Sequence, residues 1–303
     1  MSIVNTFSTF VNNITTDGKF QPESGRYHLY ISGFCPYAQR ANIALKLKGL
    51  EDAISVSVLD FIMKDGLLWF GTDIDKPHKG VTVDHLYGFK TLKELYEKAD
   101  KQQQYTGKHS VPVLWDRKLE TIVSNESHDI VRIFNSQLNN LAKYPNVNLY
   151  PEEIGLKIDK DTDWFMKNVV GQVFKQSSQE EYELSAKTFF ETIEELDRRL
   201  STSRYMFGKE LTEFDIKVFV VLIRFELCLF PSLKLNLHPL TYYNNLYNYT
   251  KELYQHPQIK STVYFDHIKG FFNIGRPGLA DPKILPLGPN LDHYESPYQR
   301  TNL

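Results

Sequence analysis

The chain has 303 residues, and its 35 Lys and Arg side chains nearly balance its 37 Asp and Glu side chains, for a formal net charge of −2 at pH 7. This balance excludes a global electrostatic field that would attract nucleic acid or an anionic membrane. The length favours two ordinary domains over one large domain. We therefore expect the partner to be a small molecule or another protein.

The cysteine content and the amino-terminal residues bear on the compartment. The only two cysteines, Cys35 and Cys228, lie far apart in the sequence, so a disulfide framework is excluded and a reducing compartment fits. The first residues, MSIVNTFSTFVNN, lack the features of a signal peptide, and no segment approaches about 18 consecutive apolar residues. We expect a cytoplasmic protein, and we discount the final TNL as a peroxisomal signal because it differs from Ser-Lys-Leu in two places.

The first predicted elements are a strand, a helix and a second strand. Residues 1–24 are polar and weakly patterned, which predicts an amino-terminal arm. The stretch RYHLYIS (26–32) is rich in β-formers, and the helix after it has Pro36 near its start and Gly49 at its stop. A second strand is predicted in ISVSVLDF (54–61). This order predicts an α/β fold with parallel strands.

Residues 62–90 interrupt this pattern with several glycines, charges and little periodicity, which is typical of an inserted excursion. The next predicted elements are a helix in TLKELYEKAD, an antiparallel strand pair in SVPVLWD and TIVSNES, and a helix in ESHDIVRIFNSQ. With the first three elements they complete a predicted domain over residues 25–140.

Residues 141–275 are predicted to form an all-helical domain. Apolar residues recur at helical spacing in five segments, 152–175, 179–200, 212–230, 239–255 and 257–271. Thr212 and Asp215 have the spacing of a capping box, with Asp in place of the usual Glu or Gln. The helix that they begin is apolar enough to be central and buried. The remaining residues, 276–303, contain several prolines and predict an extended surface tail.

Cys35 lies in SGFCPYAQR (32–40), at the predicted turn from strand to helix. A helix start offers free N–H groups and the positive end of the helix dipole, and both favour the nucleophilic thiolate. Ala38 stands where a dithiol motif would have its second cysteine, so an external thiol must resolve an oxidised Cys35 through a mixed disulfide. The alternative is a packed, inert thiol, which is the role that we predict for Cys228 within its apolar helical pattern.

Three stretches together, FCPYAQR, HSVPVLWD and TIVSNES, resemble a cysteine-dependent glutathione transferase. The sequence is most similar to the glutathionyl-hydroquinone reductases of the xi class and their fungal omega-like relatives, over about residues 24–290. The resemblance implies a thioredoxin-like glutathione-binding domain followed by an all-helical domain, which is the glutathione transferase fold. It also implies a homodimer that uses glutathione as a cosubstrate, with no metal and no bound redox cofactor.

The resemblance assigns residues on the glutathione side of the site. Cys35 matches the catalytic cysteine, and Val111 matches the residue whose backbone pairs with the cysteinyl part of glutathione, with a cis peptide bond expected before Pro112. Glu126 and Ser127 match the pair that holds the γ-glutamyl end. A carboxylate can receive its ammonium group, and a hydroxyl at a helix start can receive its carboxylate.

The sequence also departs from the family near glutathione. Tyr37 and Gln39 stand where the family has Trp and His in its cysteine motif. A family tryptophan that contacts glutathione lies in a stretch that reads GLLWF here. Either Leu67 occupies its place or Trp69 has shifted into it, and we take Trp69 as the candidate glutathione contact.

The residues on the acceptor side of the site depart further from the family pattern. Three family tyrosines line the hydroquinone pocket, and flanking residues align their positions with Phe174, Leu229 and either Phe271 or Phe272. Loss of the phenol hydroxyls removes hydrogen bonds to substrate oxygens, each worth about 1 kcal/mol. The resemblance therefore implies an intact glutathione side and a more apolar acceptor pocket.

Three functions are consistent with the sequence. The first is a glutathione-dependent thiol transferase or reductase, in which Cys35 removes glutathione from small aromatic or disulfide substrates. The second is a conventional transferase that conjugates glutathione and activates its thiol with a hydroxyl group. The third is a noncatalytic protein that binds glutathione or a hydrophobic ligand.

Overall fold

The fold is described from a computed structural model. The described residues are 10–71, 78–102, 105–171, 177–279 and 284–300. They form two compact units. The first holds the described residues up to Asn148 together with Ser261–Pro286, and the second holds Leu149–Lys260 and the described residues from Leu287 onward. Within these ranges, no helix is long and apolar enough to cross a membrane.

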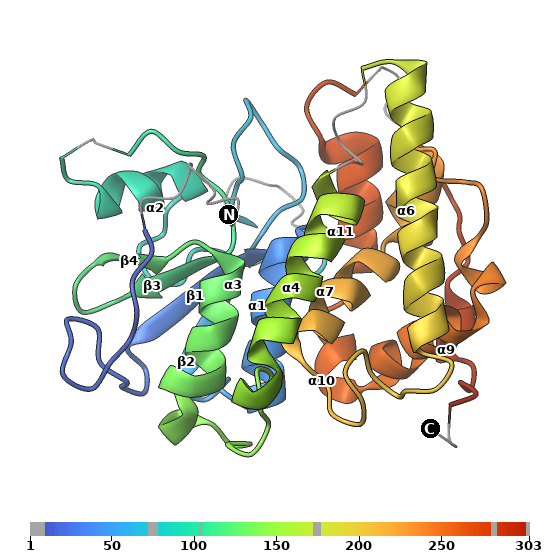
Figure 1. The fold of residues 1–303 in the computed structure, drawn as a ribbon. Coiled ribbons are helices and arrows are strands. Elements are labelled where there is room, and N and C mark those ends of the chain that lie inside the picture. The colour runs from blue at the N-terminus through green and yellow to red at the C-terminus, as the bar shows by residue number, and fades with distance from the viewer. Residues whose placement is uncertain (1–9, 72–77, 103–104, 172–176, 280–283, 301–303) are drawn as a thin grey trace. The chain divides into compact units, whose positions relative to one another are not determined.

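A four-stranded sheet organises the described part of the first unit (Figure 1). Its strand order is β2 (Ile54–Leu59), β1 (Tyr27–Ser32), β3 (Val113–Asp116) and β4 (Thr121–Ser124). Strand β1 pairs in parallel with β2 and antiparallel with β3, and β3 pairs antiparallel with β4. All residues of β1 are buried, which is why its sequence is a nearly continuous run of β-formers. The predicted parallel opening and antiparallel pair are confirmed.

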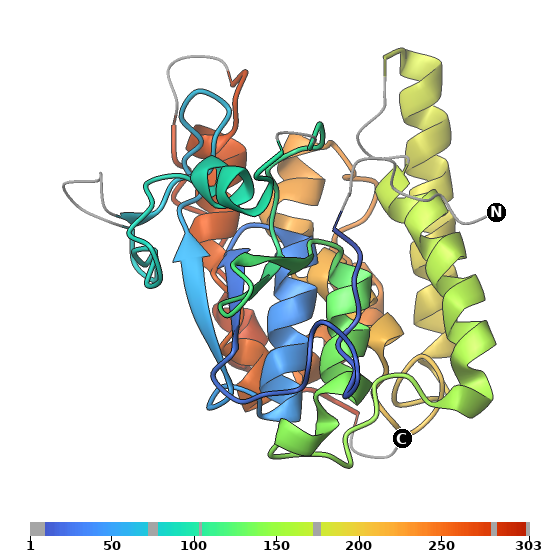
Figure 2. The ribbon, with the colours of Figure 1, turned by 90° about the vertical axis from the view of Figure 1, so that its left-hand side faces the viewer.

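The helices of the first unit begin and end at local sequence signals. Helix α1 (Pro36–Lys48) starts directly after Cys35 and ends at Gly49, whose φ of 64° lies in the left-handed region that favours glycine. Helix α2 (Leu92–Ala99) begins with a capping box. Helix α3 (Ser127–Arg132) packs beside α1, as Figure 1 and Figure 2 show. These three helices confirm the predicted helical segments of the first domain.

The excursion predicted at residues 62–90 is hydrogen-bonded to the buried sheet. The carboxylate of Asp84 accepts a hydrogen bond of 2.9 Å from the Tyr30 hydroxyl in β1. The same carboxylate accepts three more from backbone N–H groups in the five residues that follow it. A buried carboxylate is stable only when it is hydrogen-bonded, so this set of bonds fixes the second half of the excursion on the domain.

A helix from late in the sequence also belongs to the first unit. Helix α11 (Phe265–Gly270) lies within Ser261–Pro286, which groups with the sheet, whereas the sequence assigned residues 261–275 to the helical domain. One contact that joins them is at Gly33, where an added Cβ would lie 2.6 Å from Nδ1 of His267. Such a close approach has no signal in a local hydrophobic pattern.

The regular secondary structure in the described residues of the second unit is helical, apart from one isolated bridge between Tyr205 and Gly208. Its main helices are α4 (Gly155–Phe165), α6 (Gln179–Arg199), α7 (Glu213–Leu222), α9 (Asn244–Gln255) and α10 (Pro257–Lys260) (Figure 1). Every residue of α7 is buried, and Thr212 and Asp215 form its capping box. The predicted helical character and the central helix are therefore confirmed.

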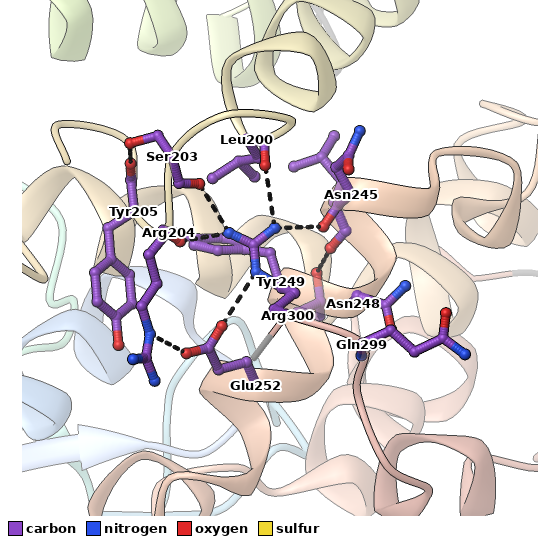
Figure 3. A network of polar contacts seen from close by, with 12 residues as sticks. Leu200, Ser203, Arg204, Tyr205, Asn245, Asn248, Tyr249, Glu252, Gln299 and Arg300 are labelled. Carbon is purple, nitrogen blue, oxygen red and sulfur yellow. Dashed lines mark hydrogen bonds and ion pairs between the residues drawn. The ribbon is translucent and has the colours of Figure 1, made fainter. Parts of the chain in front are cut away.

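Arg300 holds the carboxyl-terminal residues against the rest of the second unit through hydrogen bonds (Figure 3). Residues 284–290 are exposed, as predicted for a surface tail, but Arg300 is only 4% exposed. Its Nε donates to Glu252 at 3.1 Å. Its terminal nitrogens donate to the main-chain carbonyls of Leu200, Ser203, Arg204 and Asn245. One guanidinium thus joins α9 to the residues that follow α6.

Arg300→Met is expected to lower the free energy of unfolding by about 3 kcal/mol, because it removes the donor from one buried and three part-buried carbonyls and removes a partner of buried Glu252. Arg198→Met is the matched control, since Arg198 pairs with Glu195 while its own side chain is 73% exposed. That change should cost less than about 1 kcal/mol. Urea unfolding of both variants measures the difference, and equal losses would contradict the role given to Arg300.

Candidate active site

Cys35 occupies the position predicted for it, between β1 and α1. It is the residue that caps α1, with φ −77° and ψ 119°, and Pro36 follows as the first helical residue. The main-chain oxygen of Cys35 accepts the N–H of Gln39 at 3.0 Å, which closes the first helical turn. The half-buried thiol therefore lies at a helix start, where free N–H groups and the helix dipole favour a thiolate.

The structure brings Cys35 and Val111 together. The Cys35 thiol donates to the main-chain oxygen of Val111, with 3.6 Å between sulfur and oxygen. Val111 directly precedes Pro112, and the peptide bond between them is cis, as expected. The main-chain oxygen of Val111 therefore lies beside the Cys35 sulfur, and both residues belong to the first unit.

Glu126 and Ser127 lie at the start of α3 in the same unit. Glu126 caps the helix in an extended conformation, and its N–H donates to the Ser124 hydroxyl at 3.1 Å. Ser127 is the first helical residue and is buried. The predicted pair is thus a carboxylate and a hydroxyl next to each other at a helix start, although their contact with glutathione stays a prediction.

The Tyr37 phenol interacts electrostatically with both the Cys35 thiol and the Glu126 carboxylate. Burial raises the pKa of the Tyr37 phenol; the Arg40 guanidinium opposes this shift, and the charges of Cys35 and Glu126 add to it. The Arg40 guanidinium lies 4.8 Å from the centre of the Tyr37 ring, a cation–π distance. Cys35, Glu126, Tyr37 and Arg40 therefore share one neighbourhood. Sequence reasoning missed Arg40, whose only signal was its place one turn after Tyr37 in CPYAQR.

Trp69 lies in a short turn of the excursion. Its indole Nε1 donates to the main-chain oxygen of Lys64 at 3.4 Å, and the Lys64 ammonium lies 5.3 Å from the ring centre. Trp69 also forms an isolated bridge with Thr91. Both Trp69 and Leu67 are half-buried, so the choice between them as a glutathione contact stays a prediction.

The three predicted acceptor residues fall in different parts of the chain, and a pocket shared by them stays a prediction. Phe271 belongs to the first unit, in the π-helical turn η8 (Phe271–Gly275), and Leu229 is buried within the second unit, in η6 (Phe225–Leu229). Phe174 lies outside the described residues. Phe271 stacks on Phe34, with ring centres 3.8 Å apart and planes at 7°. Sequence reasoning missed Phe34, whose signal was an aromatic residue directly before Cys35.

Comparisons with known proteins identify related sequences. The sequence matches the family Glutathione S-transferase, N-terminal domain, over residues 34–137, and the family Glutathione S-transferase, C-terminal domain, over residues 179–251. It is 38% identical over 293 residues to the glutathionyl-hydroquinone reductase YqjG of Escherichia coli (strain K12), covering 93% of this chain and 87% of that protein.

Two solved structures are similar over nearly their whole length. The xi glutathione-S-transferase from Phanerochaete chrysosporium has a TM-score of 0.88 at 38% identity, covering 94% of this chain and 97% of that chain. The glutathione-bound structure of YqjG from Escherichia coli K-12 has a TM-score of 0.89 at 38% identity, covering 96% of each chain. These matches confirm the predicted fold class, a thioredoxin-like domain followed by an all-helical domain.

The two cysteines are expected to differ sharply in their reactivity toward an alkylating reagent. Burial raises the pKa of Cys228 to about 12, and the residue is 1% exposed, so it is neither ionised nor reachable at neutral pH. A small excess of iodoacetamide at pH 7.5 should therefore modify Cys35 alone in the native protein, and both cysteines in urea. Peptide mass spectrometry checks this outcome, and native modification of Cys228 with Cys35 untouched would contradict it.

Proposed function

Because this chain belongs to the xi-class glutathione transferase and glutathionyl-hydroquinone reductase family, we propose that it is a glutathione-dependent thiol transferase or reductase that works through Cys35. The observation that carries the proposal is the half-buried Cys35 thiol at the start of α1, 3.6 Å from the Val111 carbonyl. Ala38, in place of a second cysteine, leaves glutathione as the resolving thiol.

The reaction has two thiol-exchange steps. The Cys35 thiolate attacks the sulfur of a glutathionyl substrate, forming a mixed disulfide as the bond from that sulfur to the acceptor group breaks. The acceptor leaves with the electron pair and takes up a proton. A second glutathione thiolate then attacks the sulfur of the bound glutathione, which releases oxidised glutathione and regenerates the Cys35 thiolate.

The residues around Cys35 supply complementary groups for glutathione. In this proposal the Val111 backbone pairs with the cysteinyl part of glutathione, because it lies beside the sulfur. The Glu126 carboxylate receives the γ-glutamyl ammonium, and Ser127 at the start of α3 receives the γ-glutamyl carboxylate. Trp69 contributes an apolar face from the excursion.

The hydroxyl groups near Cys35 in sequence fit the conventional conjugating mechanism poorly. Three of them already donate elsewhere: Tyr27 to the Gln21 carbonyl, Tyr30 to Asp84, and Ser32 to the Leu59 carbonyl. The fourth, on Tyr37, has a raised pKa, which disfavours a phenolate that could accept the glutathione proton. The thiol mechanism is therefore the better supported of the two.

Cys35→Ser should lower the glutathione-dependent reduction of a glutathionyl disulfide by about three orders of magnitude or more, because it removes the nucleophile. Cys228→Ala is the matched control and should keep most of the activity, since that thiol is buried within the second unit. The coupled oxidation of NADPH by glutathione reductase measures both rates.

Two outcomes would contradict the proposal. Full turnover by the Cys35→Ser variant, with conjugation of 1-chloro-2,4-dinitrobenzene equally unaffected, would favour the conventional transferase. Binding of glutathione without turnover of any disulfide or thioether by the unaltered protein would favour the noncatalytic alternative.

A further inference from the structure

We propose that the Tyr96 hydroxyl is a positioning group for glutathione binding, because it joins the two segments that carry the predicted contacts Val111 and Glu126–Ser127. We name the chain of hydrogen bonds from the Ser110 carbonyl through the Tyr96 hydroxyl to the Asn125 amide the Tyr96 bridge. The inference rests on the proposed function and adds a residue that acts through both of these segments.

The Tyr96 bridge consists of two hydrogen bonds at one buried hydroxyl. Tyr96 lies in α2 and is 1% exposed. Its hydroxyl donates to the Ser110 carbonyl at 2.7 Å, and the amide nitrogen of Asn125 donates to the same hydroxyl at 3.1 Å. Burial raises the pKa of Tyr96, so the phenol keeps the proton that it donates. One oxygen atom therefore connects two separate segments of the chain.

Each of these segments leads directly into a predicted glutathione contact. Ser110 precedes Val111, and Asn125 precedes Glu126, the residue that caps α3. The Val111 backbone is predicted to pair with the cysteinyl part of glutathione, and Glu126 is predicted to hold its γ-glutamyl end. The bridge therefore fixes the spacing between the two parts of the site that grip the two ends of one γ-glutamyl-cysteine unit.

Tyr105 repeats this arrangement beside the bridge. The Asn125 amide nitrogen also donates to the Tyr105 hydroxyl at 3.4 Å, and that hydroxyl donates to the Lys108 carbonyl at 2.7 Å. Asn125 is 8% exposed, and a buried amide with partners for both of its N–H groups is held in one orientation. The Tyr96 link is the shorter of the two, and it acts on the residue directly before Val111.

Aromatic packing holds the Tyr96 ring in place. The ring centres of Tyr105 and His109 lie 5.0 Å and 5.1 Å from the centre of the Tyr96 ring. Phe10 meets the same ring edge to face at 6.3 Å. Close packing of this kind fixes a side chain independently of its hydrogen bonds. Tyr96→Phe therefore keeps the ring where it is and removes only the hydroxyl.

Helix α2 is also bonded to the segment that carries Trp69. Trp69 forms an isolated bridge with Thr91, the residue that caps α2, and the Leu92 N–H donates to the Leu68 carbonyl at 3.0 Å. The helix packs beside β4 as well (Figure 1). All three segments with predicted glutathione contacts are therefore bonded to one short helix, and the Tyr96 hydroxyl is its polar link to two of them.

The test measures the binding of S-methylglutathione, an unreactive analogue, by titration calorimetry. Tyr96→Phe should raise the Kd about three- to tenfold, the range expected when one hydrogen-bonding group is lost. It should lower kcat/KM for the mixed disulfide of glutathione and 2-mercaptoethanol by the same factor. Cys35 should still react with iodoacetamide at a rate within about twofold of the unaltered protein, because its place at the start of α1 does not involve the bridge.

Tyr27→Phe is the matched control. Tyr27 is 0% exposed and belongs to the same unit, and its hydroxyl donates to the Gln21 carbonyl at 2.7 Å. The change removes the same kind of hydrogen bond at the end of β1 that lies away from Cys35, and it should leave the Kd within about twofold. Equal Kd values for the two variants, or a change in the Cys35 alkylation rate as large as the change in Kd, would overturn the proposal.

A double-mutant cycle tests the path from the hydroxyl to the γ-glutamyl side. Asn125→Ala and Tyr96→Phe should each raise the Kd for S-methylglutathione. The double change should raise it by clearly less than the product of the two single effects, since both changes break the same hydrogen bond. A double effect equal to that product would show that the two groups act independently and would contradict the bridge.

Reduction of the mixed disulfide by the unaltered protein separates the positioning role from the proposed function. If the disulfide is reduced while Tyr96→Phe binds S-methylglutathione as tightly as Tyr27→Phe does, the positioning role fails and the thiol chemistry stands. If the unaltered protein does not reduce the disulfide, the proposed function itself fails.

Discussion

The close approach of the Ser32–Cys35 turn to helix α11 is the contact on which the candidate site depends. Gly33 permits it, because a Cβ there would lie within 2.7 Å of both His267 and Tyr264. The turn presents Cys35 at the start of α1, and α11 continues into the segment that brings Phe271 against Phe34. A residue from late in the sequence thereby contacts the residue that precedes Cys35, within a single compact unit.

Local signals made much of the fold and the thiol site predictable. The capping boxes that begin α2 and α7 are set by residues three apart, and Gly49 ends α1 because its backbone is left-handed. The β-rich run before Cys35 and Pro36 after it make the strand, turn and helix predictable from neighbouring residues. The thiol at a helix start follows from these neighbours alone.

The features that were not predictable depend on contacts between distant residues. No periodicity in the sequence shows that α11 packs at Gly33, that Asp84 ties the excursion to Tyr30, or that Arg300 is buried against α9. Phe34 was missed for a related reason. An aromatic residue before a cysteine has the same pattern as the end of a buried strand, and only its stack on a ring far along the chain distinguishes it.

The central claim is that Cys35 carries glutathione as a mixed disulfide during turnover. Its most direct test is the intact mass of the native protein after treatment with oxidised glutathione at neutral pH, followed by peptide mapping. The account predicts one glutathione per chain, attached to Cys35 and removed by added reduced glutathione. An unmodified Cys35, or an adduct on Cys228 instead, would contradict it.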